Sequence, residues 1–131
     1  MVESERCRVV YIEDDPEMID LVRVILNRGN YELIGVLEGR EGLQTIRQVK
    51  PAVVLLDLML PDMGGWAVYQ QMKSDEELRD IPVIVVTAQD APIDRILGEH
   101  IAKVQVYITK PFSPRELLSS VNQVLEQKTP A

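Results

Sequence analysis

Short aliphatic runs alternate along the whole chain with longer amphipathic segments, and this alternation restricts the possible folds more than any other feature. Strands separated by helix-length connections imply β–α–β crossovers, and hence a largely parallel sheet with helices on both faces. Two runs, Val53–Leu56 and Val83–Val86, are continuously aliphatic, which is typical of strands buried on both sides. We therefore predict an α/β fold with a doubly wound parallel sheet in three layers.

The periodicity predicts five strands and five helices. The strands are Arg8–Ile12, Leu33–Leu37, Val53–Leu56, Val83–Val86 and Val104–Ile108, and the helices are residues 16–27, 40–49, 65–74, 92–102 and 114–127. Asp15 before Pro16 is typical of an N-cap with proline in the first turn. Ser113 and Glu116 fit a capping box for the last helix. Trp66, Tyr69 and Met72 recur at helical spacing, which indicates core packing.

Length and composition indicate one compact domain. The chain has 131 residues, and we expect residues 7–127 to form the core, with no output domain after them. No run approaches the roughly 20 apolar residues of a membrane span, and the acidic N-terminus does not resemble a signal peptide, so we expect a cytoplasmic protein. The net charge of −7 argues against direct binding to nucleic acid. The lone Cys7 excludes an internal disulfide, and we expect it to be buried at the start of the first strand.

Polar residues follow four of the five predicted strands. Glu13 and Asp14 come after the first, Asp57 ends the third, Thr87 the fourth and Lys110 the fifth. Ligands of open α/β sheets bind beyond the carboxyl ends of the strands, so these side chains are expected to converge. Taken singly, most have ordinary structural explanations, such as acidic residues at a helix N-terminus. Asp57 does not, because it follows four buried aliphatic residues, where an unpaired charge is costly.

Taken together, these residues favour a phosphoryl-transfer site. Carboxylates held close together repel one another and need a cation, and oxygen ligands favour Mg²⁺. Lys110 would offset carboxylate and phosphoryl charge, and Thr87 would donate a hydrogen bond to a phosphoryl oxygen. Such a set suits transfer to Asp57 as the nucleophile.

Four segments carry a family resemblance: Val10–Asp15, Leu55–Gly65, Val85–Ala88 and Tyr107–Phe112. They resemble the four motifs of receiver domains in two-component response regulators, in the family's order and at similar spacing. The resemblance covers nearly the whole chain. It implies a flavodoxin-like fold with strand order 2-1-3-4-5 and a cis peptide bond between Lys110 and Pro111.

The resemblance also implies roles for the metal site. Asp57 would be the phosphoacceptor and a Mg²⁺ ligand. Asp14 would bind the ion directly, Glu13 through water, and Met59 through its backbone carbonyl. Asp15 falls beyond this acidic pair and is assigned to helix capping.

Other positions resemble the switch of the family. Thr87 would move toward the phosphoryl group, and Tyr107 would rotate inward to fill the space. Met59, Ala88 and Gln89 would flank the phosphoryl group. Because an apolar Met59 cannot orient an attacking water, we expect slow self-dephosphorylation.

The expected function is therefore a phosphorylation-dependent signalling switch. A histidine kinase or phosphotransfer protein would donate the group, and the surface around the fourth helix and fifth strand would change. We expect no turnover of an external substrate, no membrane contact, and a monomer or weak dimer. The segment Gly98–Tyr107 lacks the acidic pair that receivers often carry there, which puts in doubt the dimer mode of many DNA-binding regulators. His100 within it is interpreted as a surface residue.

Three other functions fit less well. A haloacid-dehalogenase-type phosphatase needs a second Asp two positions after the nucleophile, where this chain has Met59. A flavin-binding module cradles a phosphate after the first strand, and Glu13–Asp15 would repel that phosphate. A degenerate receiver that serves only as a scaffold is a poor match, because every site residue is of the functional type.

Overall fold

Five parallel strands form one sheet in the order β2-β1-β3-β4-β5. The computed structural model describes residues 6–60, 62–88 and 106–128. The strands are β1 (Cys7–Ile12), β2 (Tyr31–Val36), β3 (Val53–Asp57), β4 (Val83–Ala88) and β5 (Val106–Lys110). The predicted fold class and strand order are confirmed.

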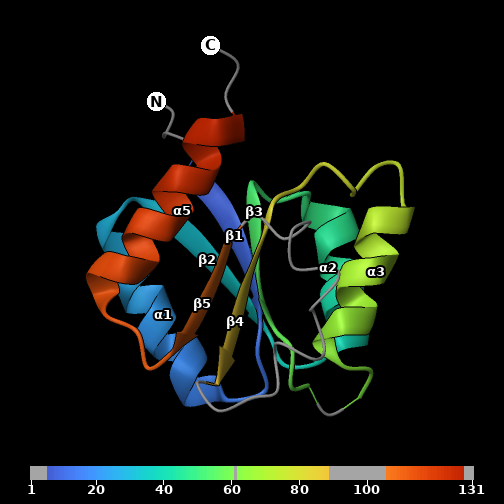
Figure 1. Ribbon diagram of the computed structural model, residues 1–131, viewed down its shortest axis with the longest axis horizontal. Helices are drawn as coiled ribbons and strands as arrows, with labels where there is room; N and C mark the ends of the chain where they lie inside the picture. Colours follow the sequence, from blue (N-terminus) through green and yellow to red (C-terminus); the bar gives the residue numbers. More distant parts are fainter. Residues whose placement is uncertain (1–5, 61, 89–105, 129–131) are drawn as a thin grey trace.

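Helices cover both faces of the sheet. Helices α1 (Pro16–Arg28) and α5 (Pro114–Lys128) lie on one face, and α2 (Gly39–Val49) and α3 (Gly65–Ser74) lie on the other (Figure 1). The predicted helix at 92–102, with His100, lies outside the described residues. Within the described ranges, no helix is both long and apolar enough to cross a bilayer.

The central strands β3 and β4 each carry a continuous aliphatic run because both faces of the sheet are covered. Successive side chains of a strand point to opposite faces. In β3, Val53 and Leu55 therefore join the cluster under α1 and α5, while Val54 and Leu56 join the cluster under α2 and α3. All four side chains are 0% exposed. The next residue, Asp57, is the first polar one and marks the end of the strand.

Both predicted helix caps are present. The Asp15 carboxylate accepts a hydrogen bond from the backbone N–H of Glu17 at 3.0 Å. Ser113 Oγ accepts from Glu116 N at 3.0 Å, and Glu116 Oε1 accepts from Ser113 N at 2.9 Å. These bonds satisfy N–H groups that have no partner within the helix.

Some boundaries differ from the prediction. Strand β2 begins at Tyr31, opposite Cys7, and the Tyr31 hydroxyl donates to Asn122 of α5. It ends before Leu37, which is 45% exposed. Strand β5 ends at Lys110, two residues later than predicted.

The prediction that Cys7 is buried is wrong. Cys7 begins β1 but is exposed, as is Arg8, and burial starts only at Val9. The first two positions of β1 lie at the amino-terminal rim of the sheet. A strand position near this rim therefore carries no guarantee of burial.

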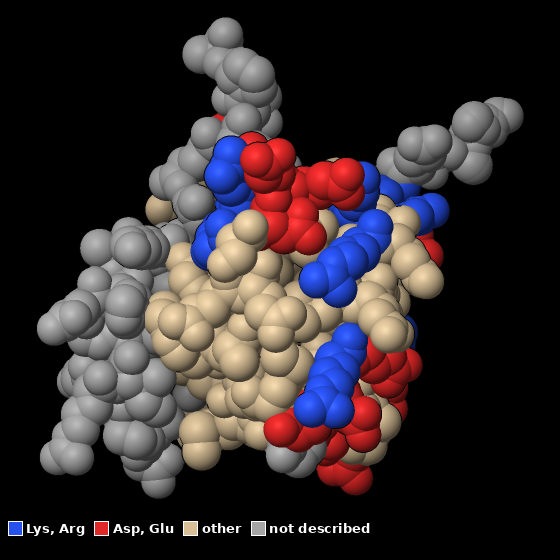
Figure 2. Space-filling model, turned by 90° about the vertical axis from the view of Figure 1, so that its right-hand side faces the viewer, with Lys and Arg blue, Asp and Glu red and all other residues tan. Residues whose placement is uncertain are grey.

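Trp66, Tyr69 and Met72 of α3 pack in the core as predicted, but Trp66 is less buried than the other two. Tyr69 and Met72 are buried, whereas Trp66 is partly buried and stacks on Tyr69 with ring centroids 5.0 Å apart. Figure 2 shows this side of the molecule, where charged side chains gather above and at the lower right of an uncharged centre. This distribution agrees with the sequence of α3, in which Lys73 is the only charged residue.

Candidate functional site

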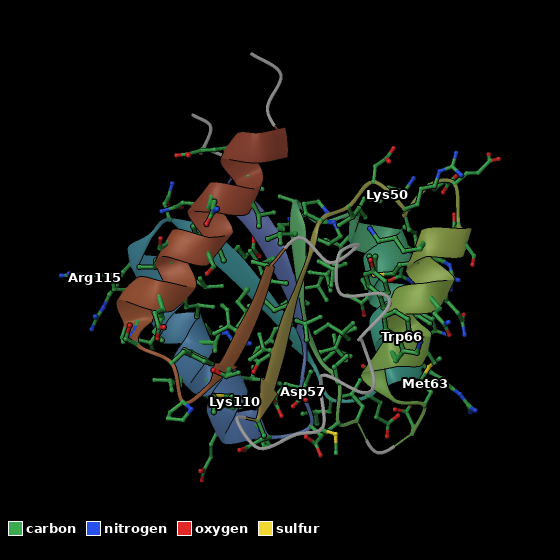
Figure 3. The ribbon with its side chains drawn as sticks, viewed as in Figure 1. Lys50, Asp57, Met63, Trp66, Lys110 and Arg115 are labelled. Carbon is green, nitrogen blue, oxygen red and sulfur yellow. The ribbon has the colours of Figure 1, made fainter. Side chains whose placement is uncertain are left out.

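The predicted polar residues meet where β1, β3 and β5 end. Figure 3 shows Asp57 and Lys110 at the same end of the sheet. Glu13 and Asp14 directly follow β1, and the Glu13 N–H donates to the Val36 carbonyl at 2.9 Å. Pairing with β2 thus continues one residue past β1 and fixes the Glu13 backbone.

Lys110 lies between two buried carboxylates. Its Nζ is 2.7 Å from Glu13 Oε1 and 3.0 Å from Asp57 Oδ2. The side chains of Glu13 and Asp57 are 1% and 5% exposed, and that of Lys110 is 21% exposed. Buried charges are stable only when they are paired and hydrogen-bonded. One ammonium group therefore compensates one of the two carboxylates, and an excess of negative charge is left whenever both are ionised.

Both oxygens of Asp57 are oriented by hydrogen bonds. Oδ1 accepts from the Met59 backbone N–H at 2.9 Å, and Oδ2 accepts from Lys110. The Met59 side chain, in contrast, is 56% exposed. The Asp57 carboxylate is thus held in one orientation at the open end of the sheet, as a nucleophile requires.

Glu13 receives two further hydrogen bonds. The Tyr11 hydroxyl donates to Oε1 at 2.8 Å, and the Asp15 N–H donates to Oε2 at 3.2 Å. Burial raises the pKa of Glu13 to about 7; the Lys110 and Tyr11 hydrogen bonds oppose this rise, and Asp57 adds to it. Burial and the neighbouring Glu13 also raise the pKa of the Tyr11 phenol, which therefore acts as a donor.

The surroundings of Lys110 raise its pKa and so favour the charged ammonium form. Burial alone would lower the pKa of Lys110, but its hydrogen bonds to Glu13 and Asp57 and their charges raise it. Lys110 is accordingly a permanent cation at neutral pH.

Three carboxylates are arranged to hold a cation. Glu13, Asp14 and Asp57 each offer one oxygen, and these atoms lie within 4.8 Å of one another. An all-oxygen set with excess negative charge fits Mg²⁺, which binds through one or two carboxylates and retains several waters. The Met59 carbonyl as a further ligand stays a prediction.

The switch residues are placed by their strands only. Thr87 in β4 pairs with Thr109, and Ala88 pairs with Lys110, so the end of β4 lies beside the site. The side chains of Thr87 and Tyr107, and the whole of Gln89, lie outside what the structure describes. Their roles stay predictions. The Lys110–Pro111 peptide bond is cis, as expected.

Sequence reasoning missed two contacts near the site. One is the Tyr11 hydroxyl on Glu13, which two signals indicate: residues i and i+2 of a strand share a face, and a buried hydroxyl needs a partner. The other is Asp62, whose carboxylate accepts from Gly39 N at 2.9 Å and Arg40 N at 3.1 Å. Asp62 caps α2 from a loop that is distant in the sequence, and no local sequence pattern predicts such a contact.

Comparison with known proteins agrees with this geometry. The response regulator receiver domain matches residues 9–122. The DNA-binding dual master transcriptional regulator RpaA of Synechocystis is 36% identical over 92% of this chain and 49% of its own length. The transcriptional regulatory protein BaeR of Escherichia coli is 33% identical over 98% of this chain and 52% of its own length. The chain thus spans about half the length of the curated relatives it matches.

A solved structure has the same fold. The signal receiver domain of a signal transduction histidine kinase from Syntrophus aciditrophicus superimposes with a TM-score of 0.83 at 28% identity, covering 92% of this chain and 91% of that one. Receiver domains bind Mg²⁺ in an acidic pocket and interact with histidine kinases or phosphotransfer proteins. The match over residues 9–122, the sheet order and the acidic site at the strand ends lead to one assignment: the chain belongs to the response regulator receiver domain family of two-component signalling systems.

Proposed function

We propose that this domain is a phosphorylation-dependent switch in which Asp57 accepts a phosphoryl group from a phosphohistidine of a histidine kinase or phosphotransfer protein. An Asp57 oxygen forms the new bond to phosphorus, and the phosphorus–nitrogen bond of the donor breaks with its electron pair returning to the imidazole. The observation that carries the proposal is the buried Asp57 carboxylate, fixed by Met59 N and Lys110 Nζ beside two further carboxylates.

The charges of the site define what each residue does. Asp14 and Asp57 would bind Mg²⁺ directly, with the Met59 carbonyl as a further ligand and Glu13 acting through water. The ion supplies positive charge that offsets the phosphoryl oxygens during transfer. Lys110, which lies 3.0 Å from Asp57 Oδ2, is placed to pair with a phosphoryl oxygen once Asp57 has become an acyl phosphate.

The signal would leave the site through the neighbouring strands. Phosphorylation adds a charge of roughly −1 to −2, which would draw the Thr87 hydroxyl inward and allow Tyr107 to follow. The surface around the fourth helix and β5 would then favour a second state. Met59, Ala88 and Gln89 would flank the phosphoryl group, and the apolar, exposed Met59 side chain gives no orientation to an attacking water.

The wider assignment follows from this role. The domain would act in the cytoplasm as a monomer or weak dimer, without membrane contact, direct nucleic-acid binding or turnover of an external substrate. We take residues 7–127 as one folded unit. Its output partner would recognise the phosphorylated surface.

Phosphorylation with a small donor tests the proposal. The protein is incubated with Mg²⁺ and acetyl phosphate, and intact mass is measured. We expect the mass of one added phosphoryl group in the wild type and in the control Asp80→Asn, which changes an exposed carboxylate at the other end of β4. Asp57→Asn and chelation of Mg²⁺ should both abolish the addition. Phosphoryl transfer to Asp57→Asn, or transfer that needs no Mg²⁺, would refute the assignment.

A further inference from the structure

Tyr11 places a hydroxyl group in the most completely buried part of the site. Its side chain is 0% exposed and belongs to the apolar cluster beneath α1 and α5. The phenolic oxygen reaches out of this cluster to Glu13 Oε1 at 2.8 Å. The ring has a packing role, whereas among the described residues the hydroxyl is paired with Glu13, a carboxylate of the candidate metal site.

The two carboxylate oxygens of Glu13 have different hydrogen-bond donors. Within the part of the chain that the structure describes, Oε1 accepts from both Tyr11 and Lys110, and Oε2 accepts from the Asp15 N–H alone. A carboxylate offers about four acceptor positions. The position that is left is therefore on Oε2, where one water of a metal ion can donate.

We propose that Tyr11 is a positioning residue for the metal site, whose hydroxyl fixes Glu13 Oε1 next to Lys110 and so presents Oε2 to the water shell of a bound Mg²⁺. This inference rests on the proposed function and adds to it a residue outside the acidic pair. Without the hydroxyl, Oε1 would keep Lys110 as its only donor, and the buried carboxylate could turn to share the ammonium between its two oxygens. Oε2 would then be less available to the water.

The variant Tyr11→Phe isolates the hydroxyl, because it keeps the buried ring. Partners of metal ligands outside the first coordination shell typically change metal affinity by about 10–100-fold when they are removed. Since Tyr11 acts through Glu13, we expect the lower end of this range, a rise of about tenfold in the Mg²⁺ dissociation constant measured by calorimetry. The Mg²⁺ concentration for half-maximal phosphorylation by acetyl phosphate should rise by the same factor, while the rate at saturating Mg²⁺ changes by less than about twofold.

A matched control removes a hydroxyl elsewhere. Tyr31 is also buried, and its hydroxyl donates to Asn122 at the amino-terminal end of the sheet. Tyr31→Phe should leave Mg²⁺ affinity unchanged, whatever it does to stability. Equal affinities of wild type and Tyr11→Phe, or an equal loss in both Phe variants, would overturn the role of Tyr11 while leaving the proposed function intact. A wild type that binds no Mg²⁺ would overturn both.

A measurement on the wild type covers the case in which Tyr11→Phe does not fold. The chain has four tyrosines, so fluorine NMR of protein labelled with 3-fluorotyrosine gives a small set of signals. Tyr→Phe changes at positions 31, 69 and 107 assign the Tyr11 signal by elimination. We expect this signal to shift along the same saturation curve as the calorimetric titration. A Tyr11 signal whose chemical shift does not change when Mg²⁺ is added would overturn the inference.

Discussion

Replacing Gly65 with alanine should damage both the fold and the site, because this glycine lies against backbone that cannot yield. Gly65 is the first residue of α3. A Cβ at this position would lie 2.3 Å from the Asp57 carbonyl oxygen and 2.6 Å from Leu58 Cα, whereas ordinary contact begins at 3.4 Å. The Gly65 N–H also donates to the Leu58 carbonyl at 3.0 Å. Relief of the clash by a shift of about 1 Å would therefore strain that bond.

The size of the effect follows from these contacts. Inserting an atom into packed structure costs about 1–3 kcal/mol, and weakening one backbone hydrogen bond adds about 1 kcal/mol. We expect Gly65→Ala to lose about 2–4 kcal/mol of unfolding free energy. Because the displaced backbone belongs to Asp57 and Leu58, which precede Met59, the affinity for Mg²⁺ should fall as well.

Urea unfolding and Mg²⁺ titration of two alanine variants test this reasoning. In the control Gly29→Ala, the tightest contact is Leu118 Cδ2 at 2.7 Å, the movable end of a side chain, and φ of −93° suits alanine. The control should change stability by less than about 1 kcal/mol and leave Mg²⁺ binding unaltered. If Gly65→Ala unfolds at the same urea concentration as Gly29→Ala and binds Mg²⁺ like the wild type, the contact with the β3 backbone does not have the rigidity we assign to it.

Two further predictions concern charged groups. Lys110→Met should lower the free energy of unfolding by about 3 kcal/mol at pH 8 and by less at pH 6. At the lower pH, Glu13, whose pKa burial raises to about 7, takes up a proton, which relieves its repulsion from Asp57. Urea unfolding that shows the same loss at both pH values would contradict this. The pKa of Asp62 is lowered by the N–H groups of Gly39 and Arg40, so its stabilising effect is present above the ordinary Asp pKa of about 4 and is lost as pH falls through its lower folded value. The difference in melting temperature between wild type and Asp62→Ala should therefore shrink below about pH 4, and a difference that persists in strong acid would exclude carboxylate capping.

The fold could be predicted because the burial of β3 is visible in the sequence as a continuous aliphatic run. A strand segment that is covered on both faces is apolar at every position. Val53–Leu56 is such a segment, because all four of its residues are aliphatic and buried. The first polar residue after such a run then marks the functional edge of the sheet. Asp57 follows β3 in this way, and Glu13 and Asp14 follow β1, so these three residues can be identified from the sequence.

Contacts between distant segments could not be predicted in the same way. Asp62 caps α2 across a separation of more than 20 residues, and the local N-cap residue Glu38 makes no side-chain cap. The exposure of Cys7 likewise depends on how neighbouring elements pack around the start of β1, which is a tertiary property. Strand ends are uncertain for the same reason, since pairing with a neighbour, as between Cys7 and Tyr31, can prolong a strand beyond its apolar core.

The uneven charge of the site is itself an argument for function. Among the described residues, the buried charged side chains are Glu13 and Asp57, and the single ammonium of Lys110 serves both. Apolar residues of similar volume are often neutral or stabilising in place of a buried ion pair, so stability alone does not account for two carboxylates. A bound divalent cation would remove the excess negative charge and stabilise the fold by mass action. The domain is therefore expected to be least stable in the absence of the ion on which the proposed phosphorylation depends, and this would couple folding stability to readiness for the signal.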